Sequence, residues 1–201
     1  SPLAEQRRER FTGGRVRWTG EGVATTCGGD GNGREWQGLT RGGEVEIPAN
    51  TSRTWFWDFE TYVCGYPELD VCGGAGARVE MQWAESLYET PEPDASDHKA
   101  HRGECAGKHW LGFGDTVLHP GGDRRYRVPW WRSGRWLRLV VTTGAEALIL
   151  RDLRPLTTGY PFERAWRFAA DEDLVPMLEV CEAGLRNCAH ETFVDCPYYE
   201  Q

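Results

Sequence analysis

No stretch of the 201-residue chain comes near the ~20 consecutive apolar residues that a membrane-spanning helix needs. Basic residues are also in deficit, because 23 lysines and arginines stand against 31 aspartates and glutamates, a formal net charge of −8. This balance argues against binding to nucleic acid or to anionic membrane surfaces, since both attract positive charge. The charged N-terminus also lacks the apolar core of a secretion signal.

The seven cysteines are an odd number and include no Cys-x-x-Cys pair. This pattern predicts no disulfide framework, and it favours a reducing, cytoplasmic compartment. Cys64 and Cys72 are spaced so that they could face each other across a hairpin. We interpret them instead as small buried apolar residues, a common role of free cysteine.

Tryptophan and glycine are abundant, with 10 and 25 residues respectively. Many tryptophans, many glycines and few helical patterns are typical of a β-sandwich with tight turns. A tryptophan ring can also stack on a sugar face, but we expect most of these rings to pack in the core.

Alternation of apolar and polar residues predicts the strands. Ala77, Val79, Met81 and Trp83 alternate with polar residues, the pattern of a half-buried strand. Further strands are predicted over 54–59, with Trp55, Trp57 and Phe59 on one face, and over 69–72, 126–128, 135–143 and 147–153. The chain should therefore form an antiparallel β-sandwich over residues 44–156, with these side chains buried: Val79, Met81, Trp83, Leu137, Leu139 and Ile149.

The glycine cluster Gly73–Gly76 lies between two predicted strands, so we interpret it as a hairpin turn. A phosphate-binding loop would need a helix directly after it, and neither this cluster nor Gly28–Gly33 has one. We therefore expect no nucleotide cofactor.

The segment from Glu89 to Gly107 is polar and contains prolines and glycines, which predicts a long exposed loop. Its histidines and cysteine are candidate zinc ligands: His98, His101, Cys105 and the nearby His109. Their spacing matches no established zinc pattern, so we predict no metal site.

The period of the pattern changes near the C-terminus. Asp171-Glu172-Asp173 supplies a helix N-cap and acidic first turn, with Pro176 close enough to the start to be tolerated. Apolar residues then recur at four-three spacing: Leu174, Leu178, Cys181, Leu185 and Cys188. A lone amphipathic helix cannot bury its stripe, so we expect a second domain that is cut after this first element. Residues 160–168 would be the linker.

Two carboxylates follow this helix, Asp195 and Glu200, on either side of a Cys196-Pro197 break. A junction between helix and loop exposes side chains while the helix holds them in place, which suits general-acid chemistry. On these residues alone, a simpler interpretation is preferred: Asp195 caps the helix end or a turn and Glu200 lies in solvent.

The motif Asp195-Cys196-Pro197-x-x-Glu200 after a helix and a tryptophan-rich sandwich resembles the bacterial α-L-rhamnosidases of glycoside hydrolase family seventy-eight. The resemblance covers nearly the whole chain, is clearest from about Glu44 onward, and includes these further stretches: Tyr66-Pro67-Glu68-Leu69, Gly73-Gly74-Ala75-Gly76-Ala77-Arg78, Trp83-Ala84-Glu85-Ser86-Leu87-Tyr88 and Trp131-Arg132-Ser133-Gly134-Arg135-Trp136. Members of this family place β-sandwich domains ahead of an (α/α)6 barrel and remove terminal rhamnose with inversion.

The resemblance implies a mainly β fold, with an accessory sandwich over 1–160 and the linker and first helix of a truncated (α/α)6 catalytic domain over 161–201. It implies that Glu200 is the general acid and that Asp195 is a carboxylate of the catalytic site that contacts the sugar. Tyr199 would also contact the substrate, and it departs from many members, which have arginine there. The general base would lie in sequence absent from this chain, which alone should be inactive.

The implied partner is a rhamnose-containing carbohydrate, with no cofactor. Two alternatives from other classes remain open. One is a non-catalytic sugar-binding module that uses exposed tryptophans, and the other is a purely structural accessory domain. Paired, solvent-facing aromatic rings would favour the first, and buried tryptophans the second.

Overall fold

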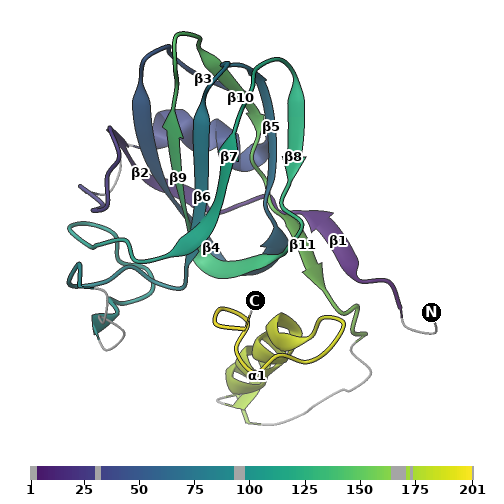
Figure 1. Ribbon diagram of the computed structural model, residues 1–201. Coiled ribbons are helices and arrows are strands. Elements are labelled where there is room, and N and C mark those ends of the chain that lie inside the picture. The colour runs from purple at the N-terminus through teal and green to yellow at the C-terminus, as the bar shows by residue number, and fades with distance from the viewer. Residues whose placement is uncertain (1–3, 30–32, 93–97, 164–170, 173, 201) are drawn as a thin grey trace.

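The computed structural model describes residues 4–29, 33–92, 98–163, 171–172 and 174–200. Within them the chain forms two antiparallel sheets that face each other, with an α-helix near the C-terminal end (Figure 1). The predicted fold class, an antiparallel β-sandwich followed by a helix, is confirmed. The sheets also include strands outside the predicted range 44–156, because the N-terminal segment joins the larger sheet.

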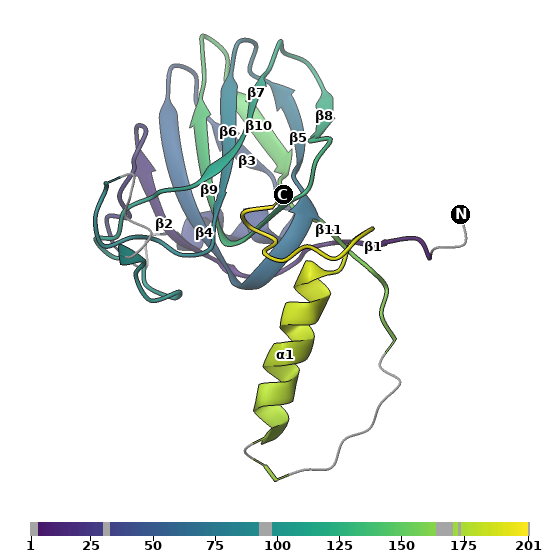
Figure 2. The ribbon, with the colours of Figure 1, turned by 60° about the horizontal axis from the view of Figure 1, so that its bottom comes forward.

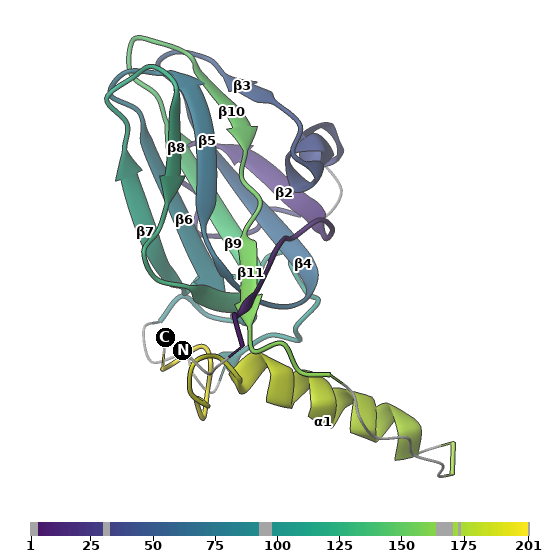
Figure 3. The same cartoon turned by 90° about the vertical axis from the view of Figure 1, so that its right-hand side faces the viewer.

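The larger sheet has seven strands in the order β1-β11-β4-β9-β6-β7, and β2 pairs with the first half of the long strand β4. The bounds are β1 Arg7–Arg10, β2 Arg15–Glu21, β4 Ser52–Tyr66, β6 Arg78–Ala84, β7 Phe113–Leu118, β9 Arg132–Thr142 and β11 Leu156–Gly159. The smaller sheet has the order β3-β10-β5-β8, with β3 Val45–Ile47, β5 Glu68–Gly73, β8 Arg124–Arg127 and β10 Leu148–Asp152. A 3-10 helix, η1 Arg34–Arg41, follows β2. Figure 3 shows the two layers from the side.

From β3 to β11 the chain crosses between the sheets at every connection except β6–β7. The hairpin predicted at Gly73–Gly76 was therefore wrong, since β5 belongs to the smaller sheet and β6 to the larger one. The cluster carries the chain across the sandwich edge, with left-handed φ angles of 71° at Gly73, 62° at Gly74 and 78° at Gly76. Glycine adopts these angles without a Cβ penalty, which serves a crossing as well as a hairpin.

The core lies between the sheets. Five of the six predicted core residues are buried: Val79, Met81, Trp83, Leu137 and Leu139. Ile149 was assigned to the wrong face, because it is only half-buried whereas its neighbours Leu148 and Leu150 are fully buried. Residues 147–150 are all apolar, so alternation could not decide which face of β10 points inward.

Part of the outer face of the larger sheet is also covered. Phe56 and Trp136 point away from the main core and pack in a second cluster with Leu87, Cys105 and Trp110. Cys105 lies within the predicted loop over 89–107, and Leu87 and Trp110 flank this loop. The loop is therefore present, but its described part is not simply solvated. It covers part of this outer face.

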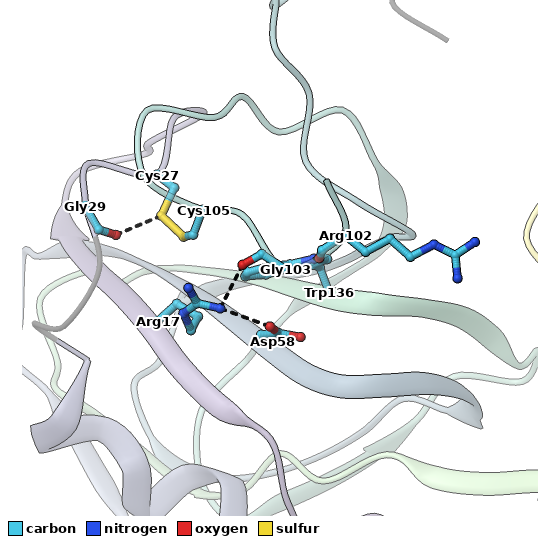
Figure 4. Close-up of a disulfide and its surroundings, with 8 residues drawn as sticks. All are labelled: Arg17, Cys27, Gly29, Asp58, Arg102, Gly103, Cys105 and Trp136. Carbon is cyan, nitrogen blue, oxygen red and sulfur yellow. Dashed lines mark hydrogen bonds and ion pairs between the residues drawn. A yellow bond between two sulfur atoms is a disulfide. The ribbon is translucent and has the colours of Figure 1, made fainter. Parts of the chain in front are cut away.

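A disulfide joins Cys27 to Cys105, with the Cα atoms 5.6 Å apart and both residues buried (Figure 4). The expectation of no disulfide was wrong, because the partners are 78 residues apart and carry no local signature. Beside the bridge, Arg17 donates a hydrogen bond to Gly103 O at 3.0 Å and pairs with the buried Asp58 at 3.1 Å. The loop is thus tied to the sheet through both a covalent bond and a charged contact.

Helix α1 spans Leu174–Cys188 and projects from the end of the sandwich (Figure 2). No residue of this helix is buried, and several of its apolar side chains are exposed: Leu174, Val175, Met177, Val180 and Leu185. Asp173 of the predicted N-cap segment 171–173, and residues 164–168 of the predicted linker, lie outside the described residues. Among the helices of the described chain, none combines the length and apolar character that crossing a bilayer would require.

Candidate functional site

After α1 the chain returns to the end of the sandwich. The amide of Tyr160, just past β11, donates a hydrogen bond to Ala189 O at 2.8 Å, and Cys64 Sγ of β4 donates to Asn187 O at 3.5 Å. The ring of His190 stacks on Trp131 with centroids 4.0 Å apart. These contacts bring the last residues against the larger sheet.

The structure brings Asp195 and Glu200 together in one loop, here named the C-terminal turn (residues 195–200). The backbone N–H of Asp195 donates to Glu200 Oε2 at 2.7 Å, and the N–H of Glu200 donates to Cys196 O at 3.0 Å. Both carboxylate residues are exposed. The Glu200 side chain therefore closes the turn.

Tyr199 and Tyr198 face different surroundings in this turn. Tyr199 is 63% exposed, and its hydroxyl accepts a hydrogen bond from Lys99 Nζ at 3.1 Å. Tyr198 is buried, donates to Trp83 O at 3.1 Å and packs on Phe113 with ring centroids 5.0 Å apart. Burial raises the pKa of Tyr198, so its hydroxyl stays protonated as a donor at neutral pH.

A polar cluster supports the turn from the sandwich side. Ser133 Oγ donates to Pro197 O at 2.7 Å, and Tyr62 OH lies 3.2 Å from the same serine oxygen and donates to Glu85 Oε1 at 3.3 Å. Glu85 Oε2 then pairs with Lys99 at 2.8 Å. Burial raises the pKa of Tyr62, with the nearby Glu85 acting in the same direction.

Sequence reasoning missed this cluster. Glu85 and Ser133 lie in two of the stretches that carry the rhamnosidase resemblance, but nothing in those stretches showed that they face the C-terminal turn. Lys99 lies within the polar loop, where only metal ligands were considered. No group of three or more metal-ligating side chains is gathered within the part of the chain that the structure describes. Cys105 is bound in the disulfide, and His109 Nδ1 lies 3.1 Å from Thr26 Oγ1.

Two cavities lie near the same end of the sandwich. One of about 780 Å³ is lined by residues that include Gln6, Arg8 and His190. A smaller one of about 210 Å³ is lined by residues that include Tyr62, Cys64 and Arg186. Burial raises the pKa of Cys64 to about 12. Neither cavity is lined by the candidate site residues Asp195, Tyr199 and Glu200.

The tryptophans lie mainly inside the molecule. Of the nine in the described residues, Trp130 is exposed, Trp18 and Trp36 are half-buried, and the following six are buried: Trp55, Trp57, Trp83, Trp110, Trp131 and Trp136. The described residues thus present no pair of exposed tryptophans. The rings serve packing, which is the use predicted for most of them.

No protein-family profile matches the sequence, and no curated protein matches it. Among solved structures, the family 78 rhamnosidase of Bacillus sp. GL1 matches with a TM-score of 0.59 and 20% identity, over 79% of this chain and 16% of its own. A rhamnosidase from Klebsiella oxytoca, solved with rhamnose bound, matches with a TM-score of 0.63 and 16% identity, over 97% of this chain and 38% of its own. The chain therefore spans well under half the length of either protein. At these identities the likeness shows the fold, and it confirms the structural resemblance to family 78 rhamnosidases that the sequence predicted.

Proposed function

We propose that the chain is part of an inverting glycoside hydrolase that removes terminal α-L-rhamnose from glycosides. Residues 1–160 would be its accessory sandwich, and residues 161–201 would open the (α/α)6 catalytic domain with α1 as the first helix. Glu200 would be the general acid. Asp195 and Tyr199 would contact the sugar.

One observation carries the proposal: two exposed carboxylate residues share a hydrogen-bonded turn in the segment after α1, in a chain with the fold of rhamnosidase structures. An inverting glycosidase needs an acid to protonate the leaving oxygen and a base about 6.5–9.5 Å away to activate water. The turn offers the acid. The base would come from residues outside this chain.

A general acid has to hold its proton near neutral pH, which takes desolvation or a neighbouring negative charge. In the complete enzyme Asp195, which lies in the same turn, would supply such a charge. Glu200 is exposed in this chain, so the catalytic domain that covers it would supply the desolvation. The exposed apolar side chains of α1 support such a covering, because a helix gains most of its stability by burying its apolar face.

For the sandwich itself we favour a structural role over sugar binding. Its tryptophans are mainly buried, and a sugar-binding face would present exposed rings. The alternative, a non-catalytic binding module, predicts retention of the isolated chain on immobilised rhamnosides.

The test uses the complete enzyme and two classes of substrate. Glu200→Gln should lower the hydrolysis of a natural rhamnoside by roughly 10²–10⁴-fold, the usual contribution of general-acid catalysis. An activated aryl rhamnoside should lose much less, because its leaving group departs without a proton. Asp195→Asn should weaken both substrates alike. Equal losses for Glu200→Gln on the two substrates would refute the acid role.

The 201-residue chain by itself should not turn over an aryl rhamnoside, since it would hold at most one half of the acid–base pair. Robust hydrolysis by the purified chain would show that both groups lie within it.

A further inference from the structure

Three consecutive residues of the C-terminal turn are held by the sandwich. Pro197 O accepts a hydrogen bond from Ser133 Oγ at 2.7 Å, and the Tyr198 hydroxyl donates to Trp83 O at 3.1 Å. The Tyr199 hydroxyl accepts from Lys99 Nζ at 3.1 Å. The residue that follows is Glu200, so these contacts fix the backbone that directs its side chain.

The two side chains that bind the turn, Ser133 and Lys99, are themselves fixed by further contacts. Ser133 is fully buried in β9, and its oxygen also meets Tyr62 OH from the neighbouring strand β4 at 3.2 Å. Lys99 pairs with Glu85, which directly follows β6 on the other side of β9, at 2.8 Å. Partial burial opposes the charge of Lys99, but its hydrogen bonds to Glu85 and Tyr199 raise its pKa, so it is a cation at neutral pH.

The loop that presents Lys99 is anchored at residues that follow Lys99 closely in the sequence. Ala100 N–H donates to Leu87 O at 2.9 Å, and Trp136 Nε1 donates to Arg102 O at 2.9 Å (Figure 4). The disulfide at Cys105 ties the loop to the segment after β2. Lys99 thus acts from a fixed backbone, which a positioning group requires.

We propose that Ser133 and Lys99 are positioning residues for Glu200, so that the sandwich aims the general acid. The inference rests on the proposed function, since it takes Glu200 as the acid. It gives the sandwich a specific part in the reaction beyond propping up a neighbouring domain. A loss of alignment of about 1 Å can cost about 100-fold in rate, so modest loosening of the turn would be measurable.

The test compares Ser133→Ala and Lys99→Met in the complete enzyme with two matched variants. Lys99→Arg keeps the charge and the donor. Lys108→Met removes a lysine of the same loop that pairs with Glu89 at 2.6 Å and Glu104 at 3.3 Å. Both kinetic constants are measured on a natural and an activated rhamnoside, together with amide hydrogen exchange of residues 195–200.

For Ser133→Ala and Lys99→Met we expect kcat on the natural rhamnoside to fall about 10- to 100-fold, with KM changed less than about twofold. The activated substrate should lose less, and the amides of Asp195 and Glu200 should exchange faster. Lys99→Arg and Lys108→Met should stay near the parent enzyme. If Ser133→Ala does not fold, the test rests on the variants of Lys99, which is partly exposed.

Glu200→Gln, assayed in parallel, distinguishes failure of the positioning role from failure of the acid role of Glu200. If it shows the leaving-group effect while Ser133→Ala and Lys99→Met keep the parent kcat and exchange rates, the positioning role is overturned and the proposed function stands. If Glu200→Gln shows no leaving-group effect, the acid role of Glu200 and the positioning role are both overturned. An equal loss in Lys108→Met would also overturn the positioning role, because it would mean a general loss of loop structure.

Discussion

Trp131 and His190 stack with their ring centroids 4.0 Å apart and their planes inclined by 20°. Both are buried, and the contact joins the start of β9 to the segment after α1. His190 Nε2 lies 3.1 Å from Asn187 O, while Nδ1 has no hydrogen-bond partner among the described residues. A second proton, on Nδ1, would have no hydrogen-bond acceptor there, so the stacked ring is neutral.

Acidification should loosen this contact. Burial lowers the pKa of His190, partly offset by the hydrogen bond to Asn187, whereas an undocked histidine titrates near its ordinary value of about 6.5. The undocked state thus binds more protons, so docking is fully stable above about pH 6.5 and weakens as pH falls through that value towards the lowered pKa. Hydrogen exchange of residues 189–194, corrected for intrinsic rates, should rise between pH 7.5 and pH 5.

His190→Phe is the matched control, because it keeps a stacking ring that does not titrate. The pH dependence of exchange in this segment should disappear in that variant. Its persistence would assign the effect to other groups at the same cavity, such as Glu5 or Glu191.

Removing the disulfide should destabilise the chain. The bridge closes a loop of 78 residues, and constraining the unfolded state over such a length contributes about 4 kcal/mol. Cys27→Ser together with Cys105→Ser should lower the free energy of unfolding by that order in denaturant titrations. Cys181→Ser, at an exposed free cysteine, should leave it unchanged. Unfolding that does not respond to loss of the bridge would contradict the pairing.

Asp58 should be among the most sensitive charged residues. It is fully buried and accepts contacts from Arg135 at 2.7 Å and from Arg17 at 3.1 Å. Removing one member of a buried ion pair leaves its partners uncompensated and typically costs about 3–5 kcal/mol. Asp58→Ala should therefore lower the unfolding free energy by about 3 kcal/mol, whereas Asp70→Ala, whose partner Arg125 is well exposed, should change it little. Thermal and denaturant unfolding of the two variants provide the comparison.

Substitution of two neighbouring residues can test which face of β10 points into the core. Leu150 is fully buried and Ile149 only half-buried. Leu150→Ala should cost about 2–5 kcal/mol, the usual range for a buried leucine, and Ile149→Ala distinctly less. Equal costs, measured by chemical unfolding, would mean that both faces of this strand are packed equally.

The alternation in β6 could be predicted from the sequence because every second residue is polar. Val79, Met81 and Trp83 are all buried, as the period of two requires. Strand β10 offered no such contrast, since residues 147–150 are all apolar. Its inward face was decided by pairing with β3 and β5, a long-range constraint.

The candidate catalytic acids also combine a local sequence signal with contacts that only the fold brings about. Asp195 and Glu200 were found from their spacing around Cys196-Pro197, a local signal. Their supporting groups Ser133 and Lys99 are 64 and 100 residues away in sequence from the residues that they bind. A local sequence pattern cannot reveal contacts between residues that are so far apart along the chain.

The sequence by itself determined the strands with clear alternation, the helix near the C-terminus and the motif that carries the rhamnosidase resemblance. These depend on the neighbours of each residue along the chain. Tertiary structure alone decided the sheet crossing at Gly73–Gly76, the pairing of Cys27 with Cys105, and the anchoring of the C-terminal turn on the sandwich. Each of these depends on which distant segments meet, and that is set by packing of the whole sandwich rather than by local preference.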